Sequence, residues 1–334
     1  MTKKKSILTV SEDFSDLFSD GKLPDRSPKK KVSAAALNGN RITLEQAIAT
    51  ITRQMTISGN RPRTISDYNV YVKQFAESML ITYVDDITSD TLYEWLSNMN
   101  VSAQTKLTRL KCLKAFLSRC FDNGWVTIKF WGKVNIRVDT KVKEGATDRE
   151  IRVLLSVLDL NDYVQLRDAT AALLMYKTGI RINTLVHLEN RHIDFENNLL
   201  QLDGGILKNH KDILLPFDDM LRRLLTVLVK QNSAIREEYK VSNEYVFITK
   251  QGRKVATGQS HNNIQKRLNK YAKEFGLKNI NPHALRRGFA KSLLNKGANI
   301  TDISRALGHS NLAVTTQYLH IDKEEVADNL RKYL

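Results

Sequence analysis

Apolar residues in the first part of the chain recur at intervals of three or four, the spacing of one helix face. This pattern opens at Thr43-x-x-Gln46, which has the form of a helix-capping box. Three further helices are expected: from about Thr64, from about Ser89 to Met99, and from about Ser102 to Phe121. Four helices joined by short loops predict a small helical bundle over residues 42–125.

The helical period stops after residue 125 and returns near residue 147. Residues 126–146 carry several lysines and arginines without a helical period, and we interpret them as a basic, extended linker. A second capping box, Thr147-x-x-Glu150, then opens a helical region that runs to about Thr178.

Short strands around a turn are expected next, from the alternating Ile193, Leu199, Gln201 and Leu202 and from the run Ile213-Leu214-Leu215-Pro216, and helices resume from about Asp218. The predicted fold class is therefore mainly α with a small antiparallel β-sheet (α+β). It comprises one helical domain over 42–125 and a second domain over 147–334.

Residues 1–41 differ from the rest of the chain. They mix Ser, Asp and Lys, contain Pro24 and Pro28, and carry the run Lys29-Lys30-Lys31. Their low apolar content predicts a flexible basic tail. Such a tail either touches a polyanion or is simply solvated.

Charge suggests the kind of partner. The 334 residues include 52 Lys+Arg against 36 Asp+Glu, a formal net charge of +16. An excess of this size favours a polyanionic partner such as nucleic acid, the alternative being a merely soluble basic protein.

The sequence also bears on the compartment. The two cysteines, Cys112 and Cys120, lie in a helical stretch and are interpreted as reduced core thiols. The N-terminus has no secretory pattern, and no segment approaches the roughly 18 apolar residues of a membrane span. A cytoplasmic, nucleoid-associated protein is expected.

Candidate chemistry lies in the second domain. His283 and Arg286 are three residues apart on one expected helix face, and Tyr318 follows His309 by nine residues. Upstream, a glycine-containing turn delivers Arg181 to the start of a helix.

These residue types suit transesterification of a phosphodiester. Arginines can hold non-bridging oxygens through bidentate, permanently charged forks, and imidazoles can bind the same oxygens or accept a proton. Lys208, in the expected turn between strands, can act as an acid, while a tyrosine forms an aryl phosphodiester whose bond energy is conserved without ATP. No carboxylate cluster has metal-ligand spacing, so no metal or other cofactor is expected.

The chain resembles the tyrosine site-specific recombinases, the phage-integrase and Xer family, in four segments. They are Thr178-Gly179-Ile180-Arg181-Ile182, His283-Ala284-Leu285-Arg286, Leu307-Gly308-His309 and Tyr318. The resemblance covers roughly residues 147–334, which makes this the catalytic domain with a C-terminal exchange helix. The bundle at 42–125 resembles the family's core-binding (DNA-binding) domain more loosely.

The resemblance implies a role for each catalytic residue. Tyr318 would attack to give a 3′-phosphotyrosyl intermediate, and Lys208 would protonate the leaving oxygen. The scissile phosphate would be held by Arg181 and Arg286, assisted by His283 and His309. The implied partner is double-stranded DNA with an inverted-repeat core site, on which a homotetramer forms a Holliday junction. An accessory or directionality factor is a further candidate partner.

The chain departs from the family pattern at three places. After Arg181 it has Asn183-Thr184-Leu185 where the family often has Ser-Glu-Leu, and Arg287 stands where the family often has His. Lys208 lacks the usual flanking glycines, and Lys211 on the same turn is a rival general acid. The candidate DNA contacts, each of which has solvated surface charge as its alternative, are Arg287, Lys211, Arg109 and Lys106.

Three functions compete. An active recombinase of integrase or resolvase type is favoured over a catalytically silent DNA-binding regulator, because the chain has a residue for every catalytic place. A topoisomerase or telomere resolvase is disfavoured, because the spacing from His309 to Tyr318 fits integrases better.

Overall fold

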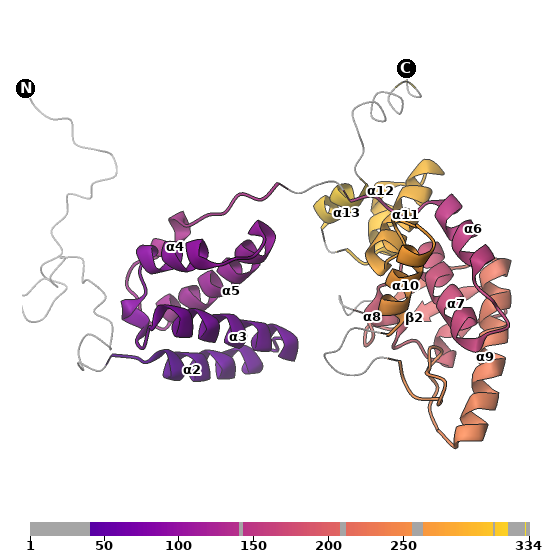
Figure 1. Cartoon of the computed structure of the whole chain (residues 1–334), viewed down its shortest axis with the longest axis horizontal. Coiled ribbons are helices and arrows are strands. Elements are labelled where there is room, and N and C mark those ends of the chain that lie inside the picture. The colour runs from indigo at the N-terminus through magenta and orange to yellow at the C-terminus, as the bar shows by residue number, and fades with distance from the viewer. Residues whose placement is uncertain are drawn as a thin grey trace, which may run out of the picture. The chain divides into compact units, whose positions relative to one another are not determined.

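The computed structural model describes residues 41–139, 143–207, 212–255, 263–309, 311–319 and 331, without the side chains of Gln317 and Tyr318. These residues fall into two units divided between residues 140 and 141, which we call the first and second unit (Figure 1). The predicted tail over 1–41 lies, apart from Arg41, outside the described residues.

The first unit is a helical bundle, as the apolar spacing predicts. The capping box at its start is formed: Thr43 Oγ1 accepts the Gln46 N–H at 3.2 Å, and Gln46 Oε1 accepts the Thr43 N–H at 3.1 Å. Its α-helices are α2 (Leu44–Ile57), α3 (Pro62–Met79), α4 (Ser89–Asn98) and α5 (Ala103–Asp122), and its 3₁₀ turns are η2 (Val84–Asp86) and η3 (Phe130–Lys133).

Helix α3 begins earlier than the predicted start at Thr64. Pro62 occupies its first turn and Arg61 is the N-cap residue. Proline suits this position because its missing N–H has no intrahelical partner there and its φ is already helical.

Some residues of the predicted linker over 126–146 pack into the cores of the two units. Trp131 and Val134, 4% and 1% exposed, belong to the core of the first unit, in which Phe75 and Trp95 pack edge to face at 5.1 Å. At the other end, Ala146 is buried in the core of the second unit. Apolar side chains set among the lysines therefore fix most of this segment, although they follow no helical period.

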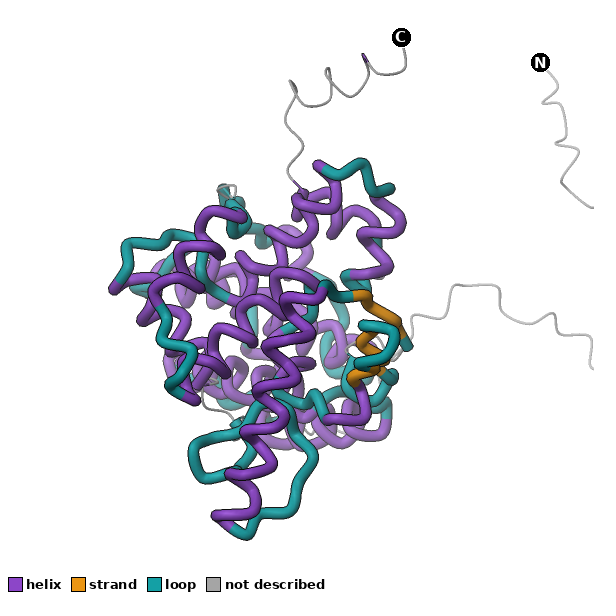
Figure 2. Tube along the Cα trace, turned by 90° about the vertical axis from the view of Figure 1, so that its right-hand side faces the viewer, coloured by secondary structure: helices purple, strands orange, loops and turns teal. Residues whose placement is uncertain are grey.

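The second unit combines helices with a small antiparallel sheet of order β1-β2-β3, which confirms the predicted fold class (Figure 2). Leu202 pairs with Ile213 and Leu199 with Pro216. Its elements are α6 (Asp148–Val157), α7 (Tyr163–Thr178), α8 (Ile182–Leu185), η4 (Asn190–His192), β1 (Ile193–Asp194), β2 (Leu199–Leu202), β3 (Ile213–Pro216), α9 (Asp219–Tyr239), α10 (Asn263–Glu274), α11 (Pro282–Asn295), α12 (Ile300–Ala306) and α13 (Leu312–Leu319).

Helix α7 is the centre of the second unit, where it packs against α9, α10 and α11. It buries the carboxylate of Asp168 completely. That carboxylate accepts hydrogen bonds from Arg167, from Arg267 of α10 and, at 3.1 Å, from the Tyr271 hydroxyl. A buried charge is tolerated only with such partners, so the network fixes α10 on α7.

The segment that leads into the second unit is fastened to α11. The Ala146 N–H donates to the Ala284 carbonyl at 2.8 Å, and Arg287 Nε donates to the Glu144 carbonyl at 2.9 Å. Gly145 and Gly288 allow the backbone of this segment to contact the backbone of α11. A Cβ at Gly145 would collide with the backbone of Gly288, and a Cβ at Gly288 would collide with the Ala146 carbonyl.

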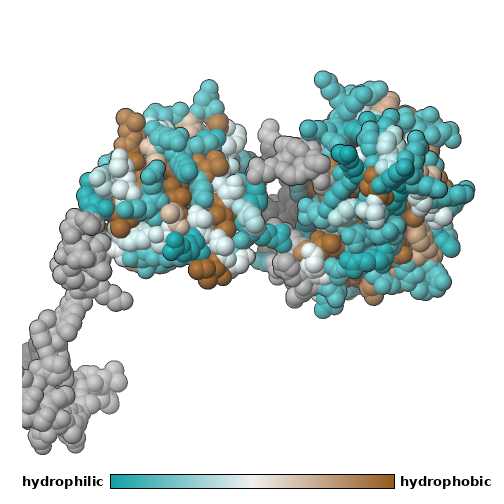
Figure 3. All heavy atoms as spheres, turned by 90° about the horizontal axis from the view of Figure 1, so that it is seen from below, coloured by the Kyte–Doolittle hydropathy of each residue, from teal (hydrophilic) through white to brown (hydrophobic). Residues whose placement is uncertain are grey.

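The surfaces of the two units differ on the face shown in Figure 3. Both units are largely hydrophilic there with scattered hydrophobic spots, and more of these spots appear on the first unit. Among the described helices of both units, none has the length and apolarity needed to cross a membrane.

Replacing Gly288 by Ala should destabilise the second unit alone. The added methyl group would collide with the Ala146 carbonyl and come within 2.8 Å of Tyr176 Cε2. Overpacking of this kind costs about 1–3 kcal/mol. All three tryptophans, Trp95, Trp125 and Trp131, lie in the first unit. We therefore expect Gly288→Ala to lower the urea midpoint seen by far-UV circular dichroism and to leave the tryptophan-fluorescence midpoint unchanged.

The control is Gly132→Ala, because a Cβ at Gly132 has nothing within 4 Å. Equal stability of the two variants would contradict the close contact between Gly145 and Gly288.

Candidate functional site

The turn after α7 delivers Arg181 to the site. Gly179 ends the helix in the left-handed region at φ 66°, where its N–H reaches the Met175 carbonyl at 3.0 Å. Glycine is required because of this φ and because a Cβ would strike the ring of Phe289. Ile180 is then buried, and Arg181 becomes the half-buried N-cap residue of α8.

Helix α11 supplies the next two groups. Asn281 caps it by accepting the Ala284 N–H at 3.0 Å, and Pro282 begins its first turn. His283 is exposed, while Arg286, three residues later, is only 3% exposed. The Arg286 guanidinium donates to the carbonyls of Gly179 and Leu307, which end α7 and α12 respectively.

His309 lies in the turn after α12 and joins Arg181 and Arg286 at the site. Its Nε2 lies 3.2 Å from an Arg286 Nη2, and its Nδ1 lies 2.9 Å from Thr315 Oγ1 on α13. A guanidinium can only donate, so Nε2 accepts, and we assign the ring proton to Nδ1, which donates to Thr315. The imidazole is therefore neutral in this arrangement.

Electrostatics support that assignment. Burial, then the charges of Arg286 and Arg181, lower the pKa of His309 to about 4. Desolvation also lowers the pKa of His283, with further contributions from the cations Arg287, Arg286, Lys143 and Arg181. Both imidazoles thus lie in a positive field that disfavours their protonation.

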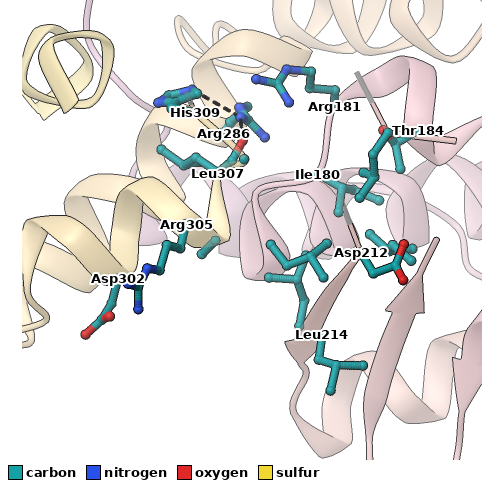
Figure 4. A pocket seen from close by; sticks show the side chains of 16 residues that line it. Ile180, Arg181, Thr184, Asp212, Leu214, Arg286, Asp302, Arg305, Leu307 and His309 are labelled. Atoms are coloured by element: carbon teal, nitrogen blue, oxygen red, sulfur yellow. Dashed lines mark hydrogen bonds between the residues drawn. The ribbon is translucent and has the colours of Figure 1, made fainter. Parts of the chain in front are cut away.

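These groups border a pocket of about 460 Å³ between α12 and the sheet (Figure 4). Arg181, Arg286 and His309 lie at one end of it, and Arg305 projects from α12 further along. Asp212 of the opposite wall precedes β3, and Asp302 precedes Arg305 on α12. The apolar lining consists of Ile180, Leu202, Leu207, Ile213, Leu214, Leu215, Ala306 and Leu307.

The structure brings together three of the six predicted catalytic residues, Arg181, Arg286 and His309. His283 shares α11 with Arg286 but is not part of the pocket lining. Tyr318 is a residue of α13, although its side chain lies outside the described part of the chain. Lys208 and the rival Lys211 lie outside the described residues.

The candidate DNA contacts that the structure describes make contacts within their own units. Lys106 Nζ donates to the Leu96 carbonyl near the end of α4 at 2.7 Å, and Arg109 lies over the ring of Tyr71 at 5.8 Å. Arg287 is half-buried and donates to the Glu144 carbonyl.

Two residues of the site were missed in the sequence. Thr315 is fully buried and binds His309, and Arg305 lies in the pocket four residues before His309. Arg305 could have been found from its place four residues, about one helical turn, before His309. No feature of the sequence marked Thr315 as a site residue, because its contact with His309 depends on how α13 packs on α12.

Comparison with known proteins assigns the family. Residues 146–325, more than half of the chain, match the model of the phage integrase family. The chain belongs to this family. The resemblance seen in the sequence motifs is thereby confirmed.

Relatives match over most of the chain. The tyrosine recombinase XerD of Staphylococcus aureus is 26% identical over 297 residues, which cover 85% of this chain and 95% of XerD. Among solved structures, the Tn1549 transposon integrase in complex with transposon right end DNA has a TM-score of 0.69 and 20% identity, covering 87% of this chain and 99% of that one. A lambda integrase dimer bound to a core site has a TM-score of 0.64 and 16% identity, covering 85% and 79%. These two structures share the integrase fold with this chain.

We expect the imidazole of His309 to titrate near pH 4 in the folded protein, below the roughly 6.5 of an unfolded histidine. The unfolded chain then binds this proton more tightly, so His309 lowers the stability as the pH falls from about 6.5 toward 4. Removing one nearby cation with Arg181→Gln should raise the midpoint. Histidine NMR measures it, with the His309→Gln variant identifying the resonance. A midpoint at or above 6.5 would rule out the neutral, Arg286-bound ring.

Proposed function

We propose that this chain is a site-specific DNA recombinase that cuts and rejoins double-stranded DNA through a covalent bond to Tyr318. The observation that carries the proposal is that Arg181, Arg286 and His309, from three separate elements, meet at one pocket. Two guanidinium groups can donate hydrogen bonds to the non-bridging oxygens of a phosphodiester. Membership of the phage integrase family and similarity to a tyrosine recombinase support the same function.

The position of Tyr318 supports its role as the nucleophile. It lies one helical turn after Thr315 on α13, and Thr315 binds His309. Its neighbour Leu319 is 2% exposed and packs with Phe289 and Ile303, so α13 is fixed against both α11 and α12. The backbone at residue 318 is thereby held beside α11, which carries Arg286, and beside α12, which His309 follows.

The reaction follows from these groups. The Tyr318 oxygen attacks phosphorus and loses its proton to a neutral imidazole, of which His283 is the more accessible. As the new aryl phosphodiester forms, the bond to the 5′ oxygen breaks, and that oxygen takes a proton from Lys208, or from its rival Lys211. The arginines stabilise the charge on the non-bridging oxygens. Attack by a 5′ hydroxyl reverses the step without ATP.

Recombination requires this step on two duplexes. We therefore propose four protomers on two inverted-repeat core sites, with a Holliday junction as the intermediate and the C-terminal segment exchanged between neighbours. The Tn1549 and lambda integrases, both solved with DNA, support DNA as the substrate.

The test is covalent capture. The full chain is incubated with fragments of its own genomic neighbourhood, denatured in SDS, and the attached DNA is sequenced. We expect adducts focused on one inverted-repeat site, and none with Tyr318→Phe, which keeps the ring but removes the attacking oxygen. Sequence-specific binding without an adduct in either protein would instead indicate a silent DNA-binding regulator.

We also propose that Arg305 binds a backbone phosphate next to the scissile one. It is exposed, lines the same pocket as Arg181 and Arg286, and makes no salt bridge with any described residue. Each phosphate contact contributes about 0.9 to the slope of log Kobs against log salt concentration. Arg305→Gln should therefore make this slope shallower by about 0.9.

The control is Arg223→Gln, which removes another exposed arginine, on α9 and away from the pocket lining. The same slope for both variants would exclude a phosphate contact for Arg305.

A further inference from the structure

A buried threonine of α13 contacts the histidine of the site. Thr315 is fully buried, and its Oγ1 lies 2.9 Å from Nδ1 of His309. The next residue, Thr316, is exposed, and its hydroxyl donates to a carbonyl of its own helix. Of these two neighbouring hydroxyl groups, the buried one is therefore the one that reaches the site.

The other ring nitrogen of His309 faces Arg286. Its Nε2 lies 3.2 Å from the Arg286 Nη2, and this same Nη2 donates to the Leu307 carbonyl (Figure 4). Each of the two Nη2 hydrogens thus has an acceptor. Nη1 donates to the Gly179 carbonyl. Thr315, His309 and Arg286 therefore form one chain of hydrogen bonds that runs from α13 to α11.

The guanidinium sets the direction of these bonds. Because it can only donate, Nε2 of His309 accepts, and the neutral ring carries its proton on Nδ1. That N–H requires an acceptor, which the Thr315 hydroxyl oxygen provides. A ring turned over would place carbon atoms opposite both partners and lose both bonds. The two contacts together thus specify one tautomer and one orientation of the imidazole.

The hydroxyl at residue 315 is the part of this arrangement that only a few side chains can supply. A valine has a similar shape but no acceptor, so it would leave the Nδ1–H facing a methyl group, and a buried donor without a partner is unfavourable. Moving the proton to Nε2 would instead set it against the N–H groups of Arg286. Either way the ring loses a bond that holds it.

Packing of α13 does not depend on that hydroxyl. Leu319 is 2% exposed and packs in one apolar cluster with Phe289 of α11 and Ile303 of α12. These contacts already hold the helix in place. The bond between Thr315 and His309 therefore serves the orientation of the imidazole more than the position of the helix.

We infer that Thr315 is a positioning residue that fixes the tautomer and orientation of His309 and, through it, the Nη2 group of Arg286. The inference rests on the proposed function, in which Arg286 binds the scissile phosphate and α13 carries the nucleophile. Thr315 lies three residues before Tyr318. The helix that carries the nucleophile would thus also align the guanidinium that holds its target.

The test compares Thr315→Val, which removes the hydroxyl, with Thr315→Ser, which keeps it. Nitrogen NMR of the full chain, labelled in its histidines, distinguishes the two neutral tautomers, and the signal missing in His309→Gln identifies His309. The rate of covalent adduct formation is measured in a single turnover on the duplex recovered by covalent capture. Equilibrium binding gives the affinity for the same duplex.

We expect His309 to be protonated on Nδ1 in the wild type and in Thr315→Ser, and to show a mixture of tautomers in Thr315→Val. Adduct formation by Thr315→Val should be about 10- to 100-fold slower, because a small misplacement of an active-site group costs up to about 10²-fold. Thr315→Ser should recover most of the rate. The affinity should change by less than about threefold, since many phosphate contacts contribute to it.

The matched control is Thr316→Val. It removes the hydroxyl of the adjacent, exposed threonine, which donates to the Leu312 carbonyl at 3.1 Å. Its tautomer, rate and affinity should equal those of the wild type. Circular dichroism confirms that all three threonine variants are folded.

The outcomes separate the two proposals. A wild type that forms no adduct with any duplex overturns the proposed function, and this inference with it. A reactive wild type whose His309 is protonated on Nε2 overturns only the positioning role. The same holds if Thr315→Val keeps the wild-type tautomer or the wild-type rate, or if Thr315→Ser is as slow as Thr315→Val.

Discussion

The second unit depends on how one buried cation is accommodated. Arg286 is almost completely enclosed, and a charge in that position is tolerated only if fixed dipoles replace its water. The carbonyls of Gly179 and Leu307 provide those dipoles from the ends of two other helices. Because the guanidinium is rigid and planar, it sets where α7 and α12 end relative to α11. The bonds that solvate the cation thus also assemble the pocket before any substrate arrives.

That arrangement determines the electrostatics of the pocket. Arg181 and Arg286 are close enough to depress the pKa of His309, so the imidazole remains a neutral acceptor. A phosphodiester entering the pocket would bring the opposite charge to a place where donors already point, with little reorganisation. In the function proposed above, the charged arginines would bind the phosphate and the neutral histidines would transfer protons.

Much of this organisation is local in sequence and could be predicted. The capping boxes at Thr43 and Thr147 involve residues only three apart. The helices themselves were predicted from apolar residues spaced three or four apart along the chain. Membership of the family followed from motifs whose order and spacing are visible without a structure. The placement of Trp131 in the first core was not predictable in this way, because its burial follows no period. Thr315 was missed for a related reason, since its partner belongs to another helix. The roles of Tyr318 and Lys208 stay predictions.

The close contact between Gly145 and Gly288 has a mechanical consequence. The chain that enters the second unit is bonded along α11 through Glu144 and Ala146, on the helix that also presents His283 and Arg286. A pull on that entering segment would act on α11 through these bonds. The joint that holds the entering chain and the Arg286 end of the pocket thus lie on one helix, so a displacement of that joint would also shift Arg286.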